Sequence, residues 1–261
     1  MKVILETRGL TRYFGRVVAA DDLSVRIEEG EWVGVVGPNG AGKTTFLNLV
    51  TGYVAPERGT IWFMGRDITG LAPRAVTRLG IARTFQVPQL YPSLTVLENA
   101  LLAWAAREGR IMDPWRPLRR TAWVAPAMDL LARFDLADDA DRPTYTLPEG
   151  KRKLLDVALA LALRPRLLLM DEPTSGVSVR EKFPLMDTLV EALTPAGVTV
   201  LFVEHDMDVV LRYAQRVLVF QGGRVVADGD PRAVLPEVSV APSGTGGNKA
   251  IRQWGNGAIG P

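Results

Sequence analysis

Nine residues near the N-terminus constrain this chain more than any other segment. Residues 37–45 read GPNGAGKTT, which fits the pattern G-x-x-x-x-G-K-[ST]. A β-rich run over residues 31–36 precedes them, and apolar residues at helical spacing follow over residues 44–51. A strand, a glycine loop and a helix in this order gather backbone N–H groups and a helix N-terminus around a phosphate. The segment therefore predicts a site for a nucleoside triphosphate, ATP with Mg²⁺.

Each position of this loop has an expected part in binding. The residues that should surround the nucleotide are Gly37, Pro38, Asn39, Gly40, Ala41, Gly42, Lys43, Thr44 and Thr45. The pattern predicts that Lys43 reaches the β- and γ-phosphates and that the Thr44 hydroxyl is a ligand of magnesium. The alternative is a glycine-rich turn with a surface lysine, which the flanking strand and helix patterns disfavour.

Two acids follow a second apolar run. Residues 167–170 read LLLM, a pattern typical of a strand buried on both faces of a parallel sheet, and Asp171 and Glu172 come directly after. At the carboxyl end of such a strand, Asp171 is expected to be a second oxygen ligand of magnesium. Glu172 is expected to polarise a water for attack on the γ-phosphate, as a general base. The alternatives are a helix N-cap for Asp171 and a solvated acid for Glu172.

The only histidine of the chain, His205, also follows a buried apolar run, residues 200–203. The carboxyl ends of parallel strands form the edge where open sheets of this kind bind ligands. We therefore expect His205 to contact the γ-phosphate or the attacking water. The alternative is a purely structural histidine.

The remaining pattern predicts an α/β chain. Residues 3–6 are expected to form an edge strand, and short β-rich runs interrupted by glycine turns follow, which indicates a mixed, partly antiparallel sheet. Residues 94–142 have helical periodicity, with an irregular excursion expected over residues 108–126 because it contains three prolines. Residues 216–227 read as a closing hairpin. The tail, residues 239–261, is rich in Gly, Ser and Asn and is expected to be poorly ordered.

Composition excludes several classes of function. The chain has no cysteine, so disulfides and thiolate chemistry are excluded, and the formal net charge is only +2, which offers no broad attraction for nucleic acid. The N-terminus has no apolar signal segment, and residues 154–163, the most apolar stretch, are about half the length of a membrane span. We expect a cytoplasmic protein with residues 154–163 as a buried helix.

The order of the motifs reveals a family resemblance. ARTFQ at residues 82–86 and LPEGK at residues 147–151 lie between the phosphate loop and Asp171. Over roughly residues 3–235 the chain resembles the ATP-binding subunit of ABC transporters. The segments IARTFQ, LTVLEN (residues 94–99) and EHDM (residues 204–207) look most like the importer ATPases for branched-chain and related hydrophobic amino acids.

The resemblance implies a fold and a domain division. The fold is the α/β fold of P-loop NTPases in its ABC ATPase form, with a mixed sheet core, an antiparallel β subdomain and a helical subdomain at about residues 90–163. The ATP-binding domain would cover residues 1–238 and the tail residues 239–261.

The resemblance also implies roles for individual residues. Phe14 would stack on adenine, with Tyr13 as the alternative. Gln86 would sense the magnesium ion and the attacking water, and would link them to the helical subdomain. Residues 147–151 match the signature motif, which in the family covers the γ-phosphate bound to the opposite subunit of a head-to-tail dimer. Its residues here are Leu147, Pro148, Glu149, Gly150 and Lys151.

The signature segment departs from the family pattern. Pro148 stands at the serine position and Glu149 at the first glycine position, and Ser178 replaces an aspartate that the family uses to connect the two sites. One reading is that the segment still covers the phosphate through its backbone and Lys151. The reading we favour is that this subunit pairs with a different ATPase, with one active and one weakened composite site.

The function implied is an ATPase subunit of an importer. Its partners would be a second ATPase subunit, two membrane permease subunits and, indirectly, an external solute-binding protein, and it would lie on the cytoplasmic face of the inner membrane. Residues 87–92 would help to receive the permease. Alternatives are an importer for urea, amides or aromatic acids, a soluble ABC ATPase without a transporter, and a regulatory module with weak hydrolysis.

Overall fold

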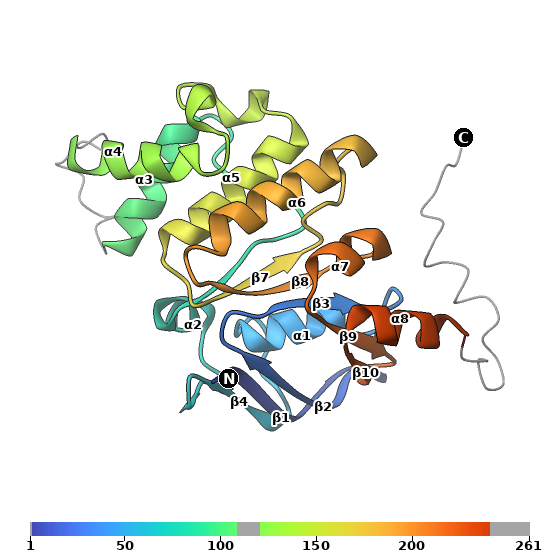
Figure 1. The fold of residues 1–261 in the computed structure, drawn as a ribbon. Coiled ribbons are helices and arrows are strands. Elements are labelled where there is room, and N and C mark those ends of the chain that lie inside the picture. The colour runs from blue at the N-terminus through green and yellow to red at the C-terminus, as the bar shows by residue number, and fades with distance from the viewer. Residues whose placement is uncertain (1, 109–120, 241–261) are drawn as a thin grey trace. The chain divides into compact units, whose positions relative to one another are not determined.

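The computed structural model describes residues 2–108 and 121–240, and the chain divides into two compact units. The first unit contains residues 1–79 and 199–261, and the second contains residues 80–198. In Figure 1 the first unit is coloured blue to teal and orange to red, and most of the second is green to yellow.

The first unit contains an antiparallel sheet formed by the N-terminal part of the chain. Its strands, in order across the sheet, are β2 (Val17–Glu28), β1 (Val3–Phe14), β4 (Arg58–Phe63) and β5 (Arg66–Asp67). A tight turn through Gly15, with a φ of 60°, joins β1 to β2, so that Phe14 and Val17 face each other. The expectation of an edge strand at residues 3–6 was wrong, because β4 pairs along the second edge of β1. That pairing is non-local, so a local pattern does not reveal it.

A second group of strands in this unit carries the phosphate loop. Its members are β3 (Trp32–Val36), β8 (Thr199–Val203), β9 (Arg216–Gln221) and β10 (Arg224–Gly229). β3 lies between β8 and β9 and is parallel to both, whereas β10 is antiparallel to β9, which confirms the predicted hairpin. All five residues of β3 and of β8 are buried. The continuous apolar runs therefore do mark strands covered on both faces.

Helices complete the first unit. They are α1 (Lys43–Val50), α2 (Pro73–Leu79), α7 (Met207–Tyr213) and α8 (Pro231–Val240). Phe46 of α1 packs on Phe220 of β9 with ring centroids 5.5 Å apart, and Figure 1 shows α1 beside the strands of its unit. Ser239 and Val240 of the expected tail belong to α8, and residues 241–261 lie outside the described residues.

The second unit is mainly helical. Its elements are β6 (Ile81–Arg83), α3 (Val96–Arg107), α4 (Thr121–Ala132), the short 3₁₀ turns η1 (Ala137–Asp139) and η2 (Thr144–Thr146), α5 (Glu149–Ala162), β7 (Leu167–Asp171) and α6 (Val179–Leu193). β6 and β7 pair in parallel. A reciprocal capping box fixes the start of α3, because Thr95 Oγ1 accepts from the Glu98 backbone and Glu98 Oε2 accepts from the Thr95 backbone.

Two expectations about the helical part are settled by these bounds. Residues 154–163 were expected to be a buried helix, and α5 confirms it through residue 162. The irregular excursion expected over residues 108–126 is wrong from Thr121 onward, where α4 begins, while residues 109–120 lie outside the described residues. Burial of Leu130 and Leu131 outweighs the one helical hydrogen bond that Pro126 removes.

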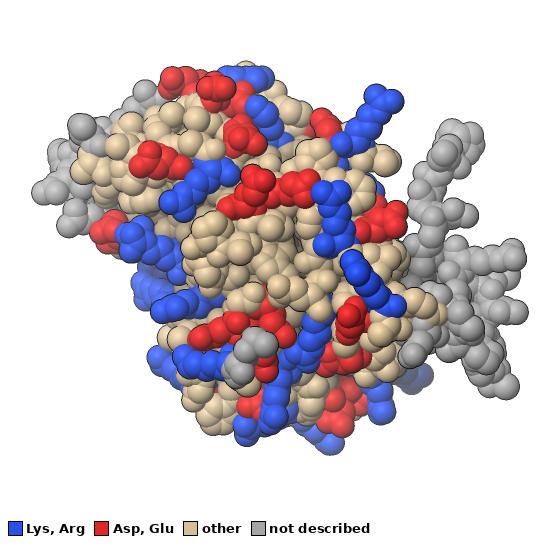
Figure 2. All heavy atoms as spheres, viewed as in Figure 1, with Lys and Arg blue, Asp and Glu red and all other residues tan. Residues whose placement is uncertain are grey.

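No helix among the described residues combines the length and the apolar character that crossing a membrane requires. Acidic and basic side chains are interspersed on the face that Figure 2 shows, in keeping with a formal net charge of +2.

Candidate nucleotide-binding site

The phosphate loop occupies the turn between β3 and α1 in the first unit. Lys43 is the first residue of α1 and only 6% exposed. Its Nζ donates to the carbonyl oxygens of Gly37 at 2.6 Å and Pro38 at 3.0 Å. The loop therefore holds the ammonium group against its own backbone. Because a nearby phosphate is attracted to this fixed positive charge, the arrangement suits an anion.

Two glycines of the loop are required by the surrounding backbone. A Cβ at Gly37 would lie 2.2 Å from the Phe220 oxygen, and a Cβ at Gly42 would lie 2.4 Å from the Ala19 oxygen. A Cβ at Gly40, by contrast, would meet nothing within 4 Å. The cradle is thus closed on the side of β2 and β9 and open beside Gly40. The first N–H groups of α1 have no partner within the helix, so this cradle fits a phosphate group.

The expected adenine platform borders this loop. Phe14 is 46% exposed and Tyr13 38% exposed, at the tip of the hairpin of β1 and β2. The Arg12 guanidinium lies 5.0 Å from the centre of the Phe14 ring. The close approach of Ala19 to Gly42 brings the second strand of this hairpin to the loop. Both aromatics are available for stacking, and the choice of Phe14 stays a prediction.

His205 lies at the same sheet edge as the phosphate loop. It follows β8, which pairs with β3 in parallel, and the Glu204 N–H donates to the Val35 oxygen at 3.2 Å. His205 itself is exposed, and its backbone N–H donates to the carboxylate of the buried Glu204 at 3.2 Å. The first unit thus groups the loop, the aromatic pair and the histidine.

In the second unit, Asp171 ends β7 and forms a buried ion pair. Arg83 Nη2 donates to Asp171 Oδ2 at 2.8 Å, and the two side chains are only 5% and 10% exposed. Arg83 belongs to the ARTFQ segment, and the sequence predicts no role for it. The pairing of β6 with β7 brings it to Asp171, and nothing in the local pattern predicts that pairing. One carboxylate oxygen of Asp171 is therefore held by the arginine.

Gln86 and Glu172 are in direct contact. Gln86 Nε2 donates to Glu172 Oε2 at 2.8 Å. The backbone of Glu172 is left-handed, with a φ of 51°, which costs a non-glycine residue about 1–2 kcal/mol. Such strain is kept where a side chain must point in one direction. The structure therefore brings together the residue expected to sense the water and the acid expected to polarise it.

Lys153 of α5 connects these two residues. The sequence patterns did not predict a role for it. It is only 5% exposed, and its Nζ donates to the backbone oxygens of Glu172 at 2.9 Å and Gln86 at 3.3 Å. One turn further, Asp156 accepts from the Gln89 N–H at 3.3 Å. The sequence does contain a signal for these two residues. A lysine and an aspartate lie in or next to the apolar stretch 154–163, and such residues are rarely buried unless they are paired.

Burial alters the ionisation of Asp156. Desolvation raises the pKa of its carboxyl group to about 6, although hydrogen bonds from the backbone of Gln89 and Phe85 and the charge of Lys153 oppose this. α5 therefore carries two buried groups that hold the segment around Gln86, one cationic and one that titrates slightly below neutral pH.

The charged groups of the signature segment are engaged within the chain. Pro148 is the N-cap of α5 and supplies no side-chain cap. Glu149 Oε2 accepts from Arg152 Nη2 at 2.6 Å. Lys151 forms an ion pair with the buried Asp139, whose pKa is lowered mainly by the hydrogen bond from Lys151. Lys151 is therefore directed to its own subunit, which weakens the reading in which it covers a phosphate across the dimer.

The expected site residues thus form two groups, one in each unit. The first unit carries residues 37–45, Phe14 and His205, and the second carries Gln86, Asp171, Glu172 and residues 147–151.

Ser178, at the aspartate position, is the N-cap of α6, and its hydroxyl donates to Glu181 Oε2 at 2.6 Å.

Comparisons with known proteins bear on both groups. The protein family described as "ABC transporter" matches residues 20–175 of this chain. LivG of Archaeoglobus fulgidus, a "probable branched-chain amino acid transport ATP-binding protein", is 37% identical over 236 residues, covering 89% of this chain and 91% of that protein. BraF of Pseudomonas aeruginosa, a "high-affinity branched-chain amino acid transport ATP-binding protein", is 35% identical over 238 residues, covering 88% and 93%.

Solved structures of similar fold agree. The ADP conformation of MJ1267, an ATP-binding cassette of an ABC transporter, has a TM-score of 0.82 and 32% identity, and covers 93% of this chain and 96% of its own. The dimeric bacterial ABC transporter cassette MJ0796 has a TM-score of 0.74 and 26% identity, covering 88% and 99%.

Proposed function

This chain belongs to the ABC transporter family, and we propose that it is the ATP-hydrolysing subunit of an importer for branched-chain or related hydrophobic amino acids. The observation that carries the proposal is the phosphate loop, where the buried Lys43 donates to the Gly37 oxygen and where Gly37 and Gly42 have no room for a side chain. The names of the relatives in Archaeoglobus and Pseudomonas support the transported class.

The chemistry follows from the residues in named roles. Lys43 and the loop amides bind the phosphates of ATP, and Glu172 polarises the attacking water, held in place by Gln86. His205 stabilises the γ-phosphate. Magnesium would be held by Thr44, Gln86 and Asp171, and it would neutralise phosphate charge. Thr44 is exposed in the first unit and Asp171 has a carboxylate in the second, and both side chains offer the oxygen ligands that this hard cation prefers.

The proposed partners are two permease subunits and a second ATPase subunit, with a solute-binding protein acting from outside. The chain would lie on the cytoplasmic face of the inner membrane, bound to the permeases. Val87 and Tyr91 are 70% and 61% exposed, which supports residues 87–92 as part of the permease-facing surface. The dimeric cassette among the structural relatives supports a dimer of ATPase subunits.

A different second subunit is favoured over a second copy. In a homodimer both nucleotides would face the carboxylate of Glu149 and a lysine already paired with Asp139. A partner with an unmodified signature segment would cover the nucleotide bound to this chain. One composite site would then turn over faster than the other.

Transport by the reconstituted complex tests the proposal. The chain, its partner ATPase and the permeases are placed in vesicles, and ATP-dependent uptake of leucine is compared with that of urea and benzoate. We expect leucine uptake that is lost with Lys43→Ala. Uptake of urea or benzoate without uptake of leucine would show that the complex transports a different class of substrate. Nucleotide binding without hydrolysis, with and without the partners, would make the chain a regulatory module instead.

A further inference from the structure

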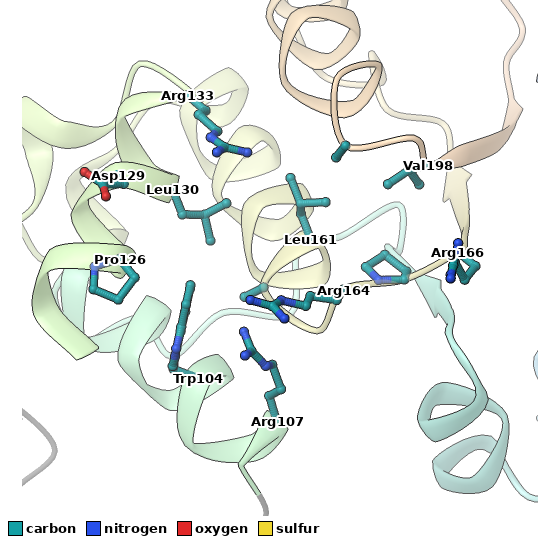
Figure 3. A pocket seen from close by; sticks show the side chains of 13 residues that line it. Trp104, Arg107, Pro126, Asp129, Leu130, Arg133, Leu161, Arg164, Arg166 and Val198 are labelled. Atoms are coloured by element: carbon teal, nitrogen blue, oxygen red, sulfur yellow. The ribbon is translucent and has the colours of Figure 1, made fainter. Parts of the chain in front are cut away.

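A pocket in the second unit takes no part in the site described above. It has a volume of about 470 Å³ and lies at the ends of α3 and α5, beside α4. Trp104, Leu130, Leu161 and Val198 form much of its apolar lining (Figure 3). Its volume is within the range of about 300–1,000 Å³ that small-molecule sites occupy. The pocket is large enough for a compact organic molecule.

The charges around this pocket are strongly one-sided. Its charged lining residues are Arg107, Arg133, Arg164, Arg166 and Asp129. Figure 3 shows the carboxylate of Asp129 pointing away from Arg107 and Arg164. Within residues 2–108 and 121–240, only Arg107 of the four arginines has an ion pair, a long one of 3.6 Å to Glu108. Among the residues that the structure describes, the lining of the pocket therefore has more positive charge than its ion pairs neutralise.

Arg164 occupies a backbone position that arginine does not favour. It follows the end of α5 with a φ of 54°, and its N–H donates to the Leu161 oxygen at 2.9 Å. Glycine or asparagine usually takes this position, and another residue costs about 1–2 kcal/mol. A cation near the C-terminal carbonyls of α5 is favourable and accounts for one arginine. It does not account for Arg107 and Arg133, which other helices bring to the pocket.

Trp104 adds a flat surface to this positive environment. Its indole is half-buried, and the Arg107 guanidinium lies 5.3 Å from the centre of its ring. A guanidinium donates two parallel hydrogen bonds to a phosphate or carboxylate, and an indole stacks on flat apolar groups. The pocket thus places both kinds of contact side by side.

We propose that this pocket binds a small organic anion, with its phosphate or carboxylate on Arg107 and Arg164 and its apolar body against Trp104 and Leu161. The inference is independent of the proposed transport function. The same chemistry has two sources, a soluble phosphorylated or carboxylated metabolite and the headgroup of an anionic lipid.

Calorimetry with the chain of 261 residues tests this site. The chain is first saturated with ADP so that the phosphate loop is occupied, and it is then titrated with phenyl phosphate, inorganic phosphate or phenol. We expect phenyl phosphate to bind more tightly than either fragment. The double variant Arg107→Gln/Arg164→Gln should weaken it at least tenfold, and Trp104→Ala should weaken phenyl phosphate more than inorganic phosphate.

A matched variant controls for charge and folding. Arg74→Gln/Arg78→Gln removes the same charge from exposed positions of α2, outside the pocket, and should leave the affinity unchanged. Thermal melting of both double variants verifies that they fold. No phenyl phosphate binding to the ADP-loaded chain, or an equal loss in the two double variants, would overturn the proposal.

Vesicles of phosphatidylglycerol distinguish the two sources. Vesicle binding that phenyl phosphate displaces, and that Arg107→Gln/Arg164→Gln abolishes, would identify a lipid headgroup as the ligand. Binding of phenyl phosphate without binding to vesicles would identify a soluble metabolite. Either result supports the pocket, provided that the arginine dependence holds.

Discussion

The phosphate loop and the signature segment are both turns in front of a helix, but they differ in charge. The first turn of α1 contains Lys43 and no acid, whereas the first turn of α5 contains Glu149 behind the N-cap Pro148. A helix N-terminus attracts anions through its free N–H groups. The first turn of α1 is thus free of acids, whereas the first turn of α5 carries a carboxylate that pairs with Arg152. We therefore propose that the chain combines a working nucleotide-binding half with an altered covering half.

The altered segment is nevertheless well satisfied within its own subunit. Glu149 pairs with Arg152, and the buried Asp139 accepts from both Lys151 and Arg142. Releasing Lys151 toward a phosphate would leave Arg142 as the remaining counter-charge of Asp139. The departure from the family pattern is therefore a set of compensated contacts, with α5 still connected to Glu172 through Lys153.

The strongest expected effect concerns the buried acid that helps to hold α5 to the Gln86 segment. In the folded chain the pKa of Asp156 is about 6, above its usual 3.8, so the folded state binds the proton more readily. The free energy of unfolding should therefore fall as the pH rises from about 4 to 6 and stay lowered above that, by roughly 3 kcal/mol. Asp156→Asn, which cannot ionise but still accepts hydrogen bonds, should be more stable than the parent at pH 8 by about that amount.

Urea unfolding of both proteins at pH 4 and pH 8 measures this. The stability difference should nearly vanish at pH 4, where the parent carboxyl is protonated. A difference of the same size at both pH values would show that ionisation of Asp156 has no part in it.

Lys153→Met separates turnover from nucleotide binding. The substitution removes the ammonium group that donates to the backbone oxygens of Glu172 and Gln86, and it keeps an apolar side chain of similar length. The Glu172 carboxylate should then lose its alignment with the attacking water. Misplacement of this kind lowers turnover by on the order of 10- to 100-fold. ADP affinity, which rests on the phosphate loop, should be unchanged. Lys153→Arg retains a donor and should recover part of the activity; equal losses in both variants would contradict a positioning role.

Restoring the family pattern at residues 148 and 149 tests whether the altered signature segment limits ATP hydrolysis. Pro148→Ser with Glu149→Gly returns a hydroxyl donor and removes the carboxylate. If the native segment covers poorly, ATPase turnover at the site that it covers should rise by about tenfold, as expected for one hydrogen bond to a charged group, measured in a complex whose other site is disabled by Glu172→Gln. Glu149→Gln alone separates the charge from the hydroxyl. Unchanged turnover in both variants would mean that the native segment already covers its phosphate.

The smallest expected effect concerns the adenine platform. Phe14→Ala should weaken ATP binding about threefold to tenfold, the usual size of an aromatic stacking contact. Tyr13→Ala, at the neighbouring exposed position, should have little effect. The reverse order in a fluorescent-nucleotide titration would assign stacking to Tyr13.

The sequence predicted the elements whose signals are local. The phosphate loop, its strand and helix, and the buried strands before Asp171 and His205 all follow from short patterns. The pair of Arg83 and Asp171 joins residues 88 positions apart, and Lys153 reaches Gln86 over 67 positions. Such contacts depend on strand pairing and helix packing, which short sequence patterns do not reveal. For the same reason the local pattern predicted an edge strand where β1 lies inside its sheet.

The asymmetric model gives this subunit a working nucleotide-binding half and a weakened covering half. Its most direct test is ATP hydrolysis by the reconstituted complex with Glu172→Gln here, and then with the equivalent change in the partner ATPase. We predict unequal losses: at least tenfold for Glu172→Gln, whose general base contributes on the order of 10²-fold or more, and less than about twofold for the partner. Equal losses would contradict the asymmetric account.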